Sequence, residues 1–252
     1  MPGLTVVVGA AQGIGEGIAR HLATTSWTER IVLADINGPL AEKVAADLRR
    51  AGRAAEALQV DIADDASTQA LVAATADAER VAIVAGIFKA VPSLETTRDD
   101  FDRILGVNLI GNFFVAQAYA ARMVERGSGS IVAIASIASR MPRLRQAAYC
   151  ASKAGMRQAL RVLAMETVPR GVRINFVSPG PTESPMMTTL AADHPIDDLA
   201  KGSLDSFRPR VPDARVGRAL DVGQAVAFLL GPESGHVAMH DLYVDGGESL
   251  GM

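Results

Sequence analysis

Tyr149 and Lys153 are the pair of residues in this chain that could best perform proton transfer. The run Tyr149-Cys150-Ala151-Ser152-Lys153 spaces them i, i+4, so on a helix both side chains share one face. An ammonium group close to a phenol favours the phenolate and lowers the tyrosine pKa from its reference value of about 10. We therefore expect Tyr149 to act as a general base near neutral pH, or as the acid in the reverse direction.

Two further polar residues extend this pair into a catalytic set. Ser136 stands upstream of Tyr149, at the end of the apolar run Ser130–Ala135. Asn108 is a polar residue within an otherwise apolar helical stretch, from Ile104 to Val115. Chance could produce the Tyr–Lys spacing alone, but its position after a strand and close to Ser136 favours an active site.

A glycine-rich loop directly after the first apolar run predicts a dinucleotide site. The loop reads Gly9-Ala10-Ala11-Gln12-Gly13-Ile14-Gly15 and opens a helix. Glycines at such a turn let the backbone approach a pyrophosphate, which the N–H groups at the helix N-terminus then bind. The alternative is that the glycines serve packing only. We expect Gly9, Gln12, Gly13, Ile14 and Gly15 to contact the cofactor.

Asp35 and Ile36, at the end of the second apolar run, indicate which dinucleotide binds. A carboxylate there accepts hydrogen bonds from the adenosine ribose hydroxyls and repels a 2′-phosphate. No Lys or Arg lies in the glycine loop or just after Asp35, so NAD is preferred over NADP. The alternative is that Asp35 caps the next helix. Asp61 and Ile62 could border the adenine, or Asp61 could cap the helix that follows.

The substrate side is less well defined by the sequence. Arg143 and Gln146 lie in the loop before Tyr149, and a guanidinium can bind a carboxylate through two hydrogen bonds. Met186, Met187 and Phe207 could form an apolar wall for a ring. The alternatives are a solvated surface arginine and ordinary lid packing.

The elements that must position these residues alternate between apolar runs and helical segments. The apolar runs are Leu4–Val8, Arg30–Ala34, Ala55–Val60, Val81–Ala85, Ser130–Ala135, Val172–Val177 and His240–Val244. Most are continuously hydrophobic, which is typical of strands buried on both faces. Helical segments such as Pro39–Ala51 and Phe101–Arg126 separate them. The sequence therefore predicts an α/β protein of the Rossmann type, with a doubly wound, seven-stranded parallel sheet covered by helices on both faces.

The 252 residues fit one domain, 1–252, with no internal repeat or linker. The stretch 183–212 is too long for an ordinary connection between a strand and a helix, and we expect it to form a lid beside the site.

Composition excludes several classes of function. A net charge of -3 gives no footprint for nucleic acid or an anionic membrane. Cys150 is the single cysteine, and we interpret it as a packed side chain. The four histidines show no metal-ligand spacing, so no metal is expected: His21, His194, His236 and His240. With no signal segment and no apolar run of membrane-spanning length, a soluble cytoplasmic protein is expected.

Together, these motifs resemble the short-chain dehydrogenase/reductase family from Leu4 to about Gly247. The matching features are the glycine loop, Asn108, Ser136, Tyr149, Lys153 and Pro179-Gly180. The resemblance implies that Ser136 holds the substrate oxygen, Tyr149 transfers the proton and Lys153 binds the nicotinamide ribose. It implies that Asn108 supports a proton-relay water and that the protein is a homotetramer. It also implies cofactor contacts at Ala85, Gly86, Pro179, Gly180 and Thr182.

The chain departs from the family pattern at two places. Val8 stands where the family usually has Thr, and Ile83-Val84-Ala85-Gly86 replaces a common Asn-Asn-Ala-Gly sequence. These changes remove hydrogen-bonding side chains that tie the central strands together, which puts the rigidity of this segment in question.

Several segments resemble one branch of the family, which oxidises 2,3-dihydro-2,3-dihydroxybenzoate in catechol siderophore synthesis. They are Met141-Pro142-Arg143, Ser178 to Met186, Phe207-Arg208, Val211-Pro212, and the ending Val244 to Gly251, with Met239 in place of a common glycine. The implied substrate is a carboxylated cyclic alcohol, oxidised with NAD. The alternatives are the amino analogue 2,3-dihydro-3-hydroxyanthranilate, reduction of a 3-oxoacyl group, and, outside the enzymes, an NAD-binding sensor.

Overall fold

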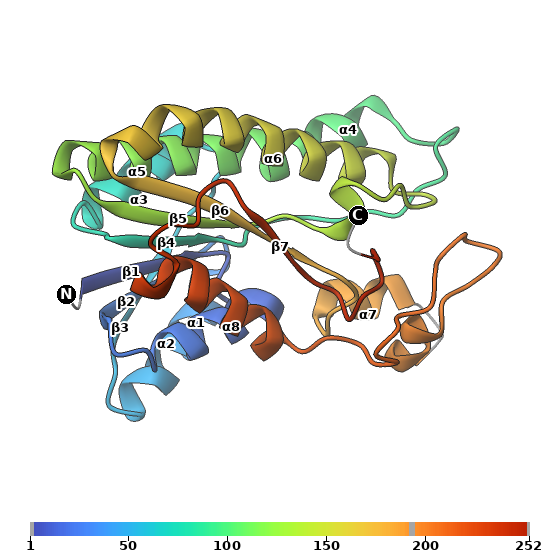
Figure 1. Cartoon of the computed structure of the whole chain (residues 1–252), viewed down its shortest axis with the longest axis horizontal. Helices are drawn as coiled ribbons and strands as arrows, with labels where there is room; N and C mark the ends of the chain where they lie inside the picture. The colour runs from blue at the N-terminus through green and yellow to red at the C-terminus, as the bar shows by residue number, and fades with distance from the viewer. Residues whose placement is uncertain (1–2, 192–194, 251–252) are drawn as a thin grey trace.

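A seven-stranded parallel sheet forms the centre of the molecule (Figure 1). The computed structural model describes residues 3–191 and 195–250. The strands are β1 (Gly3–Val8), β2 (Thr28–Asp35), β3 (Ala54–Gln59), β4 (Arg80–Ile83), β5 (Gly129–Ile134), β6 (Val172–Pro179) and β7 (Asp241–Val244). Each predicted apolar run coincides with one of these strands, to within a few residues at its ends.

The strands lie in the order β3-β2-β1-β4-β5-β6-β7, and every neighbouring pair is parallel. The chain reverses its direction of winding between β1 and β4. In such sheets a crevice for ligands opens at the carboxyl ends of the strands at this point. The fold therefore places the ends of β1, β4 and β5 around one site.

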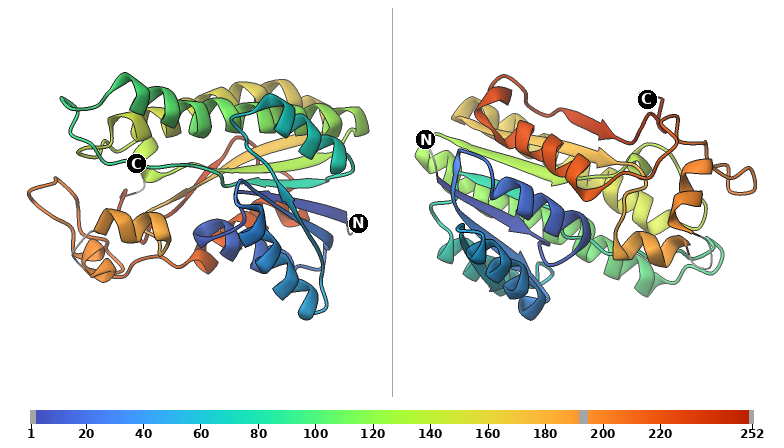
Figure 2. Two further views of the ribbon diagram at one scale, coloured as in Figure 1. Left: turned by 180° about the vertical axis from the view of Figure 1, so that it is seen from behind. Right: turned by 90° about the horizontal axis from the view of Figure 1, so that it is seen from below.

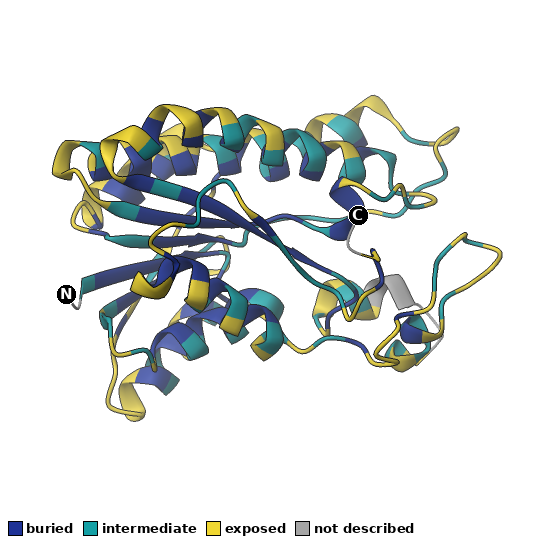
Figure 3. Ribbon diagram, in the orientation of Figure 1, coloured by how far each residue is buried: buried dark blue, intermediate teal, exposed yellow. Residues whose placement is uncertain are grey.

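Two helical layers cover the sheet (Figures 1 and 2). One contains α1 (Gly13–Leu22), α2 (Gly38–Arg50) and α8 (Ala219–Leu230), and the other contains α3 (Asp65–Ala74), α4 (Arg98–Leu105), α5 (Asn112–Arg126) and α6 (Ala147–Thr167). The strands are mostly buried, whereas the outer faces of the helices are exposed (Figure 3). The structure thus has the doubly wound arrangement that the sequence predicts.

The side chains of β1 show how the two layers share the sheet. Val6 and Val8 pack in the core beneath α5 and α6, whereas Val7 packs in the core beneath α1 and α8. All three are fully buried. Successive strand residues point to opposite faces, so a run of consecutive valines serves both cores. Each buried valine contributes roughly 1.5–3 kcal/mol relative to an exposed one.

One continuous helix, Arg98–Arg126, joins α4 and α5 through a π-helical segment, Gly106–Gly111. Its 29 residues are long and apolar enough to span a membrane by length and composition, which the sequence reading missed. Its buried side chains, including Val115, Tyr119 and Met123, belong to the core under the sheet. We therefore assign it to the helical layer that covers one face of the sheet.

The segment 183–212 projects beside the carboxyl ends of the strands (Figures 1 and 2). It contains α7 (Pro185–Ala191) and a 3₁₀ helix, Ile196–Lys201. Ala200 and Val211 pack with Val216 in a small apolar cluster of their own. This cluster is separate from the two main cores, so the segment adds little to either of them.

Candidate active site

A cavity of about 410 Å³ opens at the carboxyl ends of the strands. It brings together predicted residues from the whole length of the chain. On the cofactor side these are Gly9, Gln12, Gly13, Ile14, Gly15, Asp35, Ile36, Asp61, Ile62, Ala85, Gly86, Lys153, Pro179, Gly180 and Thr182. On the substrate side they are Ser136, Arg143, Gln146, Tyr149, Met186 and Met187. Asn108 lies fully buried and is not part of the cavity lining.

The glycine loop has the close approaches that a dinucleotide cradle needs. Gly9 has a φ of +88°, in the region that favours glycine. A Cβ on Gly15 would lie 1.7 Å from the carbonyl oxygen of Gly9, so any side chain there would separate α1 from the turn. The first N–H groups of α1 have no intrahelical acceptors and lie at the positive end of the helix dipole. The loop therefore fits an anionic pyrophosphate.

Asp35 supports this loop instead of capping a helix. Its Oδ2 accepts a hydrogen bond from Ala11 N at 2.9 Å, and its Oδ1 accepts one from Asn37 N at 2.9 Å. The N-cap of α2 is Asn37, whose side chain accepts from Leu40 N. The carboxylate thus stands in the cavity wall with acceptor capacity left for ribose hydroxyls.

Asp61 is likewise not the cap of the helix that follows it. The N-cap of α3 is Asp64, which accepts hydrogen bonds from Ala66 N and Ser67 N. Asp61 accepts from Ala63 N at 2.9 Å and lines the cavity beside Ile62. Of the two alternatives left open by the sequence, the structure excludes the cap and leaves the adenine contact as a prediction.

Tyr149 is held at the cavity by Ser136 and Phe88. Its hydroxyl shares a side-chain hydrogen bond with Ser136, which follows β5. Ser136 Oγ also accepts from Ala138 N at 3.1 Å, and this fixes the hydroxyl side chain. The Phe88 ring packs edge-on against the Tyr149 ring, with the centroids 5.1 Å apart. A substrate oxygen between Ser136 and Tyr149 would meet both hydroxyl groups.

The expectation that Lys153 lowers the pKa of Tyr149 is wrong. Burial raises the pKa of Tyr149 to about 12, and the bond to Ser136 only partly offsets this. Lys153 Nζ donates to the carbonyl of Ile134 at 2.8 Å and lies 6.0 Å from the Tyr149 ring centroid. Burial also lowers the pKa of Lys153 to about 8. Desolvation therefore outweighs the attraction between the two groups.

Asn108 has a positioning role that the sequence did not specify. Its Oδ1 accepts from Ile87 N at 2.8 Å, and its Nδ2 donates to Ile87 O at 2.9 Å and to Ser152 Oγ at 3.1 Å. It thereby ties the segment after β4 to α6, between Tyr149 and Lys153. The π-helical turn around Asn108 aims the side chain inward.

The segment Ile83–Gly86 is well tied despite its departure from the family pattern. Val84 N and Ala85 N both donate to Val8 O, at 2.8 and 3.0 Å. Asn112 Nδ2 donates to Ala85 O at 2.9 Å. A long helix thus supplies the side-chain bonds that the missing asparagines would have made, so the concern about rigidity is not supported.

On the substrate side, Phe207 is not where the sequence reading placed it. Its side chain is 82% exposed and is not among the residues that line the cavity. Phe207 has a φ of +51° within a tight turn closed by an antiparallel bridge between Ser203 and Arg208. This turn presents Arg208 to the cavity instead.

Arg208 and Glu248 are the site residues that sequence reasoning missed. Both line the cavity near Arg143, and each comes from a segment far from the catalytic motif in sequence. Only the resemblance of the lid and the C-terminal segment to one branch of the family drew attention to them, without a role. No spacing rule links residues 143, 208 and 248.

The thiol of Cys150 is half-buried, and burial raises its pKa. This disfavours a nucleophilic role. In residues 3–191 and 195–250 no group of three His, Cys, Asp or Glu side chains could hold a metal ion. His194 lies outside the described residues.

The fold and this cavity define a class of protein. A family model described as "Enoyl-(Acyl carrier protein) reductase" matches residues 9–249, and the chain belongs to the short-chain dehydrogenase/reductase family. It is therefore an oxidoreductase of the class that uses a nicotinamide dinucleotide.

Among individual proteins, the chain is similar to a 2,3-dihydro-2,3-dihydroxybenzoate dehydrogenase of Bacillus subtilis (strain 168), with 36% identity over 99% of this chain and 97% of the relative. It is also 36% identical to a D-threitol dehydrogenase of Mycolicibacterium smegmatis, over 98% of this chain and 93% of the relative. A crystal structure of a 3-ketoacyl-(acyl-carrier-protein) reductase from Brucella melitensis, complexed with NADH, superposes with a TM-score of 0.86 at 28% identity, covering 98% of both chains.

Proposed function

We propose that this protein oxidises a ring alcohol on a dihydro-aromatic carboxylic acid with NAD, converting 2,3-dihydro-2,3-dihydroxybenzoate to 2,3-dihydroxybenzoate. The observation that carries the proposal is the position of Arg143. Its side chain is 11% exposed, pairs with Glu248 and lines the same cavity as Ser136 and Tyr149. A buried cation close to the proton-transfer pair suits a substrate whose reacting alcohol and carboxylate sit on one ring.

The chain's residues divide the reaction between them. Ser136 and Tyr149 bind the oxygen of the ring alcohol, and Tyr149 removes its proton. Lys153 would hold the nicotinamide ribose. A nicotinamide dinucleotide held by the glycine loop and Lys153 would supply the acceptor for the hydride that leaves the alcohol carbon. The resulting ketone loses a ring proton as it tautomerises to the aromatic product, which makes the oxidation hard to reverse.

NAD, not NADP, is supported by Asp35. Its carboxylate stands in the cavity wall, where a 2′-phosphate on the adenosine ribose would meet a negative charge. No basic residue lies in the glycine loop to offset the repulsion. The NADH complex of the Brucella melitensis ketoacyl reductase means that cofactor choice does not separate 3-oxoacyl reduction from this reaction, and Arg143 carries that distinction instead.

The same residues bear on two other candidate substrates, a neutral polyol and an amino analogue of the acid. A neutral polyol such as threitol carries no carboxylate that Arg143 could bind in addition to Glu248, so it would make no use of this arginine. The amino analogue 2,3-dihydro-3-hydroxyanthranilate keeps the ring, the carboxylate and the reacting alcohol. Arg143 and Tyr149 would accept both acids, so the test compares the two acids as substrates.

The test compares NADH formation from 2,3-dihydro-2,3-dihydroxybenzoate, its amino analogue and a cyclohexadiene diol that lacks the carboxylate. We expect turnover of the hydroxy acid with NAD, and at least about tenfold lower kcat/KM for the diol without a carboxylate, since it lacks a charge-assisted bond. A higher kcat/KM for 2,3-dihydro-3-hydroxyanthranilate would make that compound the substrate. A higher kcat/KM for the neutral diol would contradict the role of Arg143. Biological effects that persist in Tyr149→Phe would favour a sensor.

We also propose a homotetramer. Large apolar side chains remain exposed on α5 and α6, among them Phe114, Val162 and Met165. Helical faces of this kind form interfaces between subunits. Light scattering on the purified protein tests the proposal, and a monomeric mass would contradict it.

A further inference from the structure

Three charged side chains from distant segments meet in the wall of the cavity. Arg143 comes from the loop after β5, Arg208 from the lid, and Glu248 from the segment after β7. Arg143 Nη2 donates to Glu248 Oε1 at 2.6 Å, and Arg208 Nε donates to the same oxygen at 3.4 Å. The three side chains are 11%, 16% and 0% exposed, respectively.

The position of Glu248 is fixed by the turn that precedes it. Asp245 accepts hydrogen bonds from Gly247 N at 3.0 Å and from Ser249 N at 2.9 Å, and its own carbonyl accepts from Glu248 N. These bonds fold the chain tightly around Glu248. They fix the backbone of Glu248, whereas in the described residues its carboxylate is hydrogen-bonded only by the two arginines, and Oε2 is buried without a partner.

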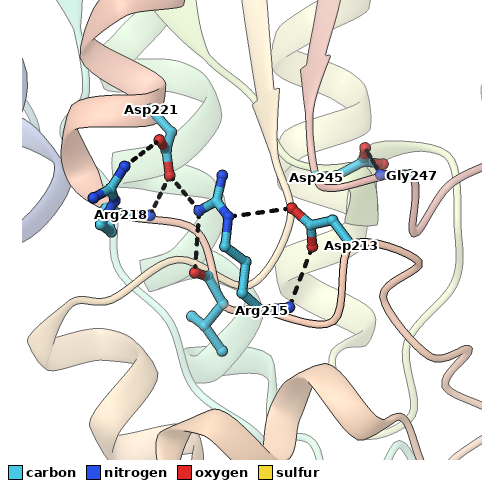
Figure 4. Close-up of polar contacts among 7 residues, drawn as sticks. Asp213, Arg215, Arg218, Asp221, Asp245 and Gly247 are labelled. Atoms are coloured by element: carbon cyan, nitrogen blue, oxygen red, sulfur yellow. Dashed lines mark hydrogen bonds and ion pairs between the residues drawn. The ribbon is translucent and has the colours of Figure 1, made fainter.

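The base of the lid is fixed against the same turn. Asp213 N donates to the carbonyl of Gly246 at 3.2 Å. Arg215 pairs with Asp213 at 3.3 Å and with Asp221 of α8 at 2.6 Å, as Figure 4 shows. This network joins the exit of the lid to the body of the protein. Between the network and the turn at Ser203, the lid brings Arg208 to Glu248.

The charges of this cluster do not balance. Two guanidinium groups share one carboxylate, which leaves a net charge of +1 in a region largely removed from water. Burial lowers the pKa of Arg208, and the neighbouring Arg143 lowers it further while Glu248 raises it. In the described part of the chain, each guanidinium has one hydrogen-bonded nitrogen, so most of its N–H donors are unused. Buried charges of this kind call for another anion.

We infer that Arg143 and Arg208 together form a seat for a single carboxylate on the substrate ring, and that Glu248 is the positioning residue that holds both guanidinium groups. This inference rests on the proposed function and adds a second binding residue, contributed by the lid. A carboxylate at the seat would neutralise the excess charge and link the lid to the substrate. A ligand without a carboxylate leaves the arginines mutually repelling.

The test measures equilibrium binding to the NAD-saturated protein of two probes, 2,3-dihydroxybenzoate and its uncharged amide, 2,3-dihydroxybenzamide. The wild type should bind the acid at least about 30-fold more tightly than the amide. Arg208→Met should weaken binding of the acid about 10- to 100-fold, as expected for loss of a charge-assisted bond, and change binding of the amide less than about threefold. In this variant Arg143 still pairs with Glu248, so the fold should hold.

Two further variants separate charge from position. Arg208→Lys keeps the charge but loses the planar fork, and should recover only part of the acid binding. Glu248→Gln keeps the shape but releases the arginines, and should reduce the ratio of acid to amide affinity while NAD affinity is unchanged. If Glu248 had a purely structural role, Glu248→Gln would weaken the binding of NAD, of the acid and of the amide together.

Binding of the acid within about twofold of wild type in Arg208→Met would overturn the inference. So would a wild type that binds the acid no better than the amide, or not at all. The proposed function fails by a different measurement, if the wild type forms no NADH from the dihydroxy acid. The two failures are therefore distinguishable.

Discussion

The ammonium nitrogen of Lys153 lies 6.0 Å from the ring centroid of Tyr149 and donates its hydrogen bond to the carbonyl of Ile134 instead. Both side chains are buried, and burial shifts both pKa values towards the neutral forms, to about 12 for Tyr149 and about 8 for Lys153. Proton abstraction by Tyr149 near neutral pH therefore needs a further positive charge beside the phenol, and in the proposed reaction the oxidised nicotinamide would supply it.

We expect Tyr149 to remain protonated in the cofactor-free protein until the pH approaches its pKa of about 12. The chain has only three tyrosines, so the tyrosinate absorbance of wild type minus that of Tyr149→Phe isolates this residue. Saturation with NAD should move this difference signal to lower pH, since a nearby positive charge favours the phenolate. A signal near neutral pH without cofactor would show that Lys153 alone is sufficient.

Lys153→Met should change how stability depends on pH. The pKa of Lys153 is about 8 in the folded protein and 10.5 in the unfolded chain. Between these values the unfolded chain binds more protons, so raising the pH stabilises the folded wild type. Over this window the free energy of unfolding of the cofactor-free wild type should rise by about 3 kcal/mol relative to Lys153→Met.

Urea denaturation of both proteins at several pH values measures this difference. Parallel curves for the two proteins would show that Lys153 titrates at its ordinary pKa.

Asp35→Asn should reduce the preference for NAD over NADP. The amide oxygen can still accept a hydrogen bond from Ala11 N or Asn37 N, which keeps the glycine loop in place, but the negative charge is lost. We expect the ratio of kcat/KM for NAD to that for NADP to fall about tenfold or more, since repulsion of the 2′-phosphate disappears. Glu42→Gln, which removes an exposed charge from α2, is the control. An unchanged ratio in Asp35→Asn would remove the basis for NAD specificity.

Asn108→Ala should lower the stability of the protein as well as its catalytic rate. The substitution removes three hydrogen bonds, to Ile87 N, Ile87 O and Ser152 Oγ, and each lost hydrogen bond costs about 0.5–1.5 kcal/mol. Thermal unfolding should show a loss of roughly 2–5 kcal/mol, whereas Arg103→Ala, on the exposed face of the same helix, should change little. Lost activity with unchanged stability would instead favour a direct role, as in the proposed proton relay.

The seven strands and the cofactor side of the site were predictable because they depend on local patterns. Continuous apolar runs gave the seven strands, and the glycine loop and Asp35 follow two of them directly. The π-helical turn around Asn108 has no such local signal, since it depends on bonds to Ile87 and Ser152. The pKa of Tyr149 was predicted in the wrong direction because spacing reveals that Lys153 is close but not how deeply both groups are buried.

The lid shows the same limit most clearly. Phe207 and Arg208 are neighbours in sequence, and apolar character favoured Phe207 as the ring contact. The turn closed by Ser203 and Arg208 reverses that choice, because it leaves Phe207 exposed and brings Arg208 to Glu248. A loop without a repeating pattern does not specify which side chain faces inward.

The most direct test of the proposed reaction is the rate of NADH formation from 2,3-dihydro-2,3-dihydroxybenzoate and NAD by the wild type and by Tyr149→Phe. We expect the wild type to form NADH and 2,3-dihydroxybenzoate in equal amounts. Tyr149→Phe should bind NAD normally and turn over about 10²- to 10⁴-fold more slowly, the loss expected when a general base is removed. No NADH from the wild type, or an unchanged rate in Tyr149→Phe, would contradict the proposed reaction.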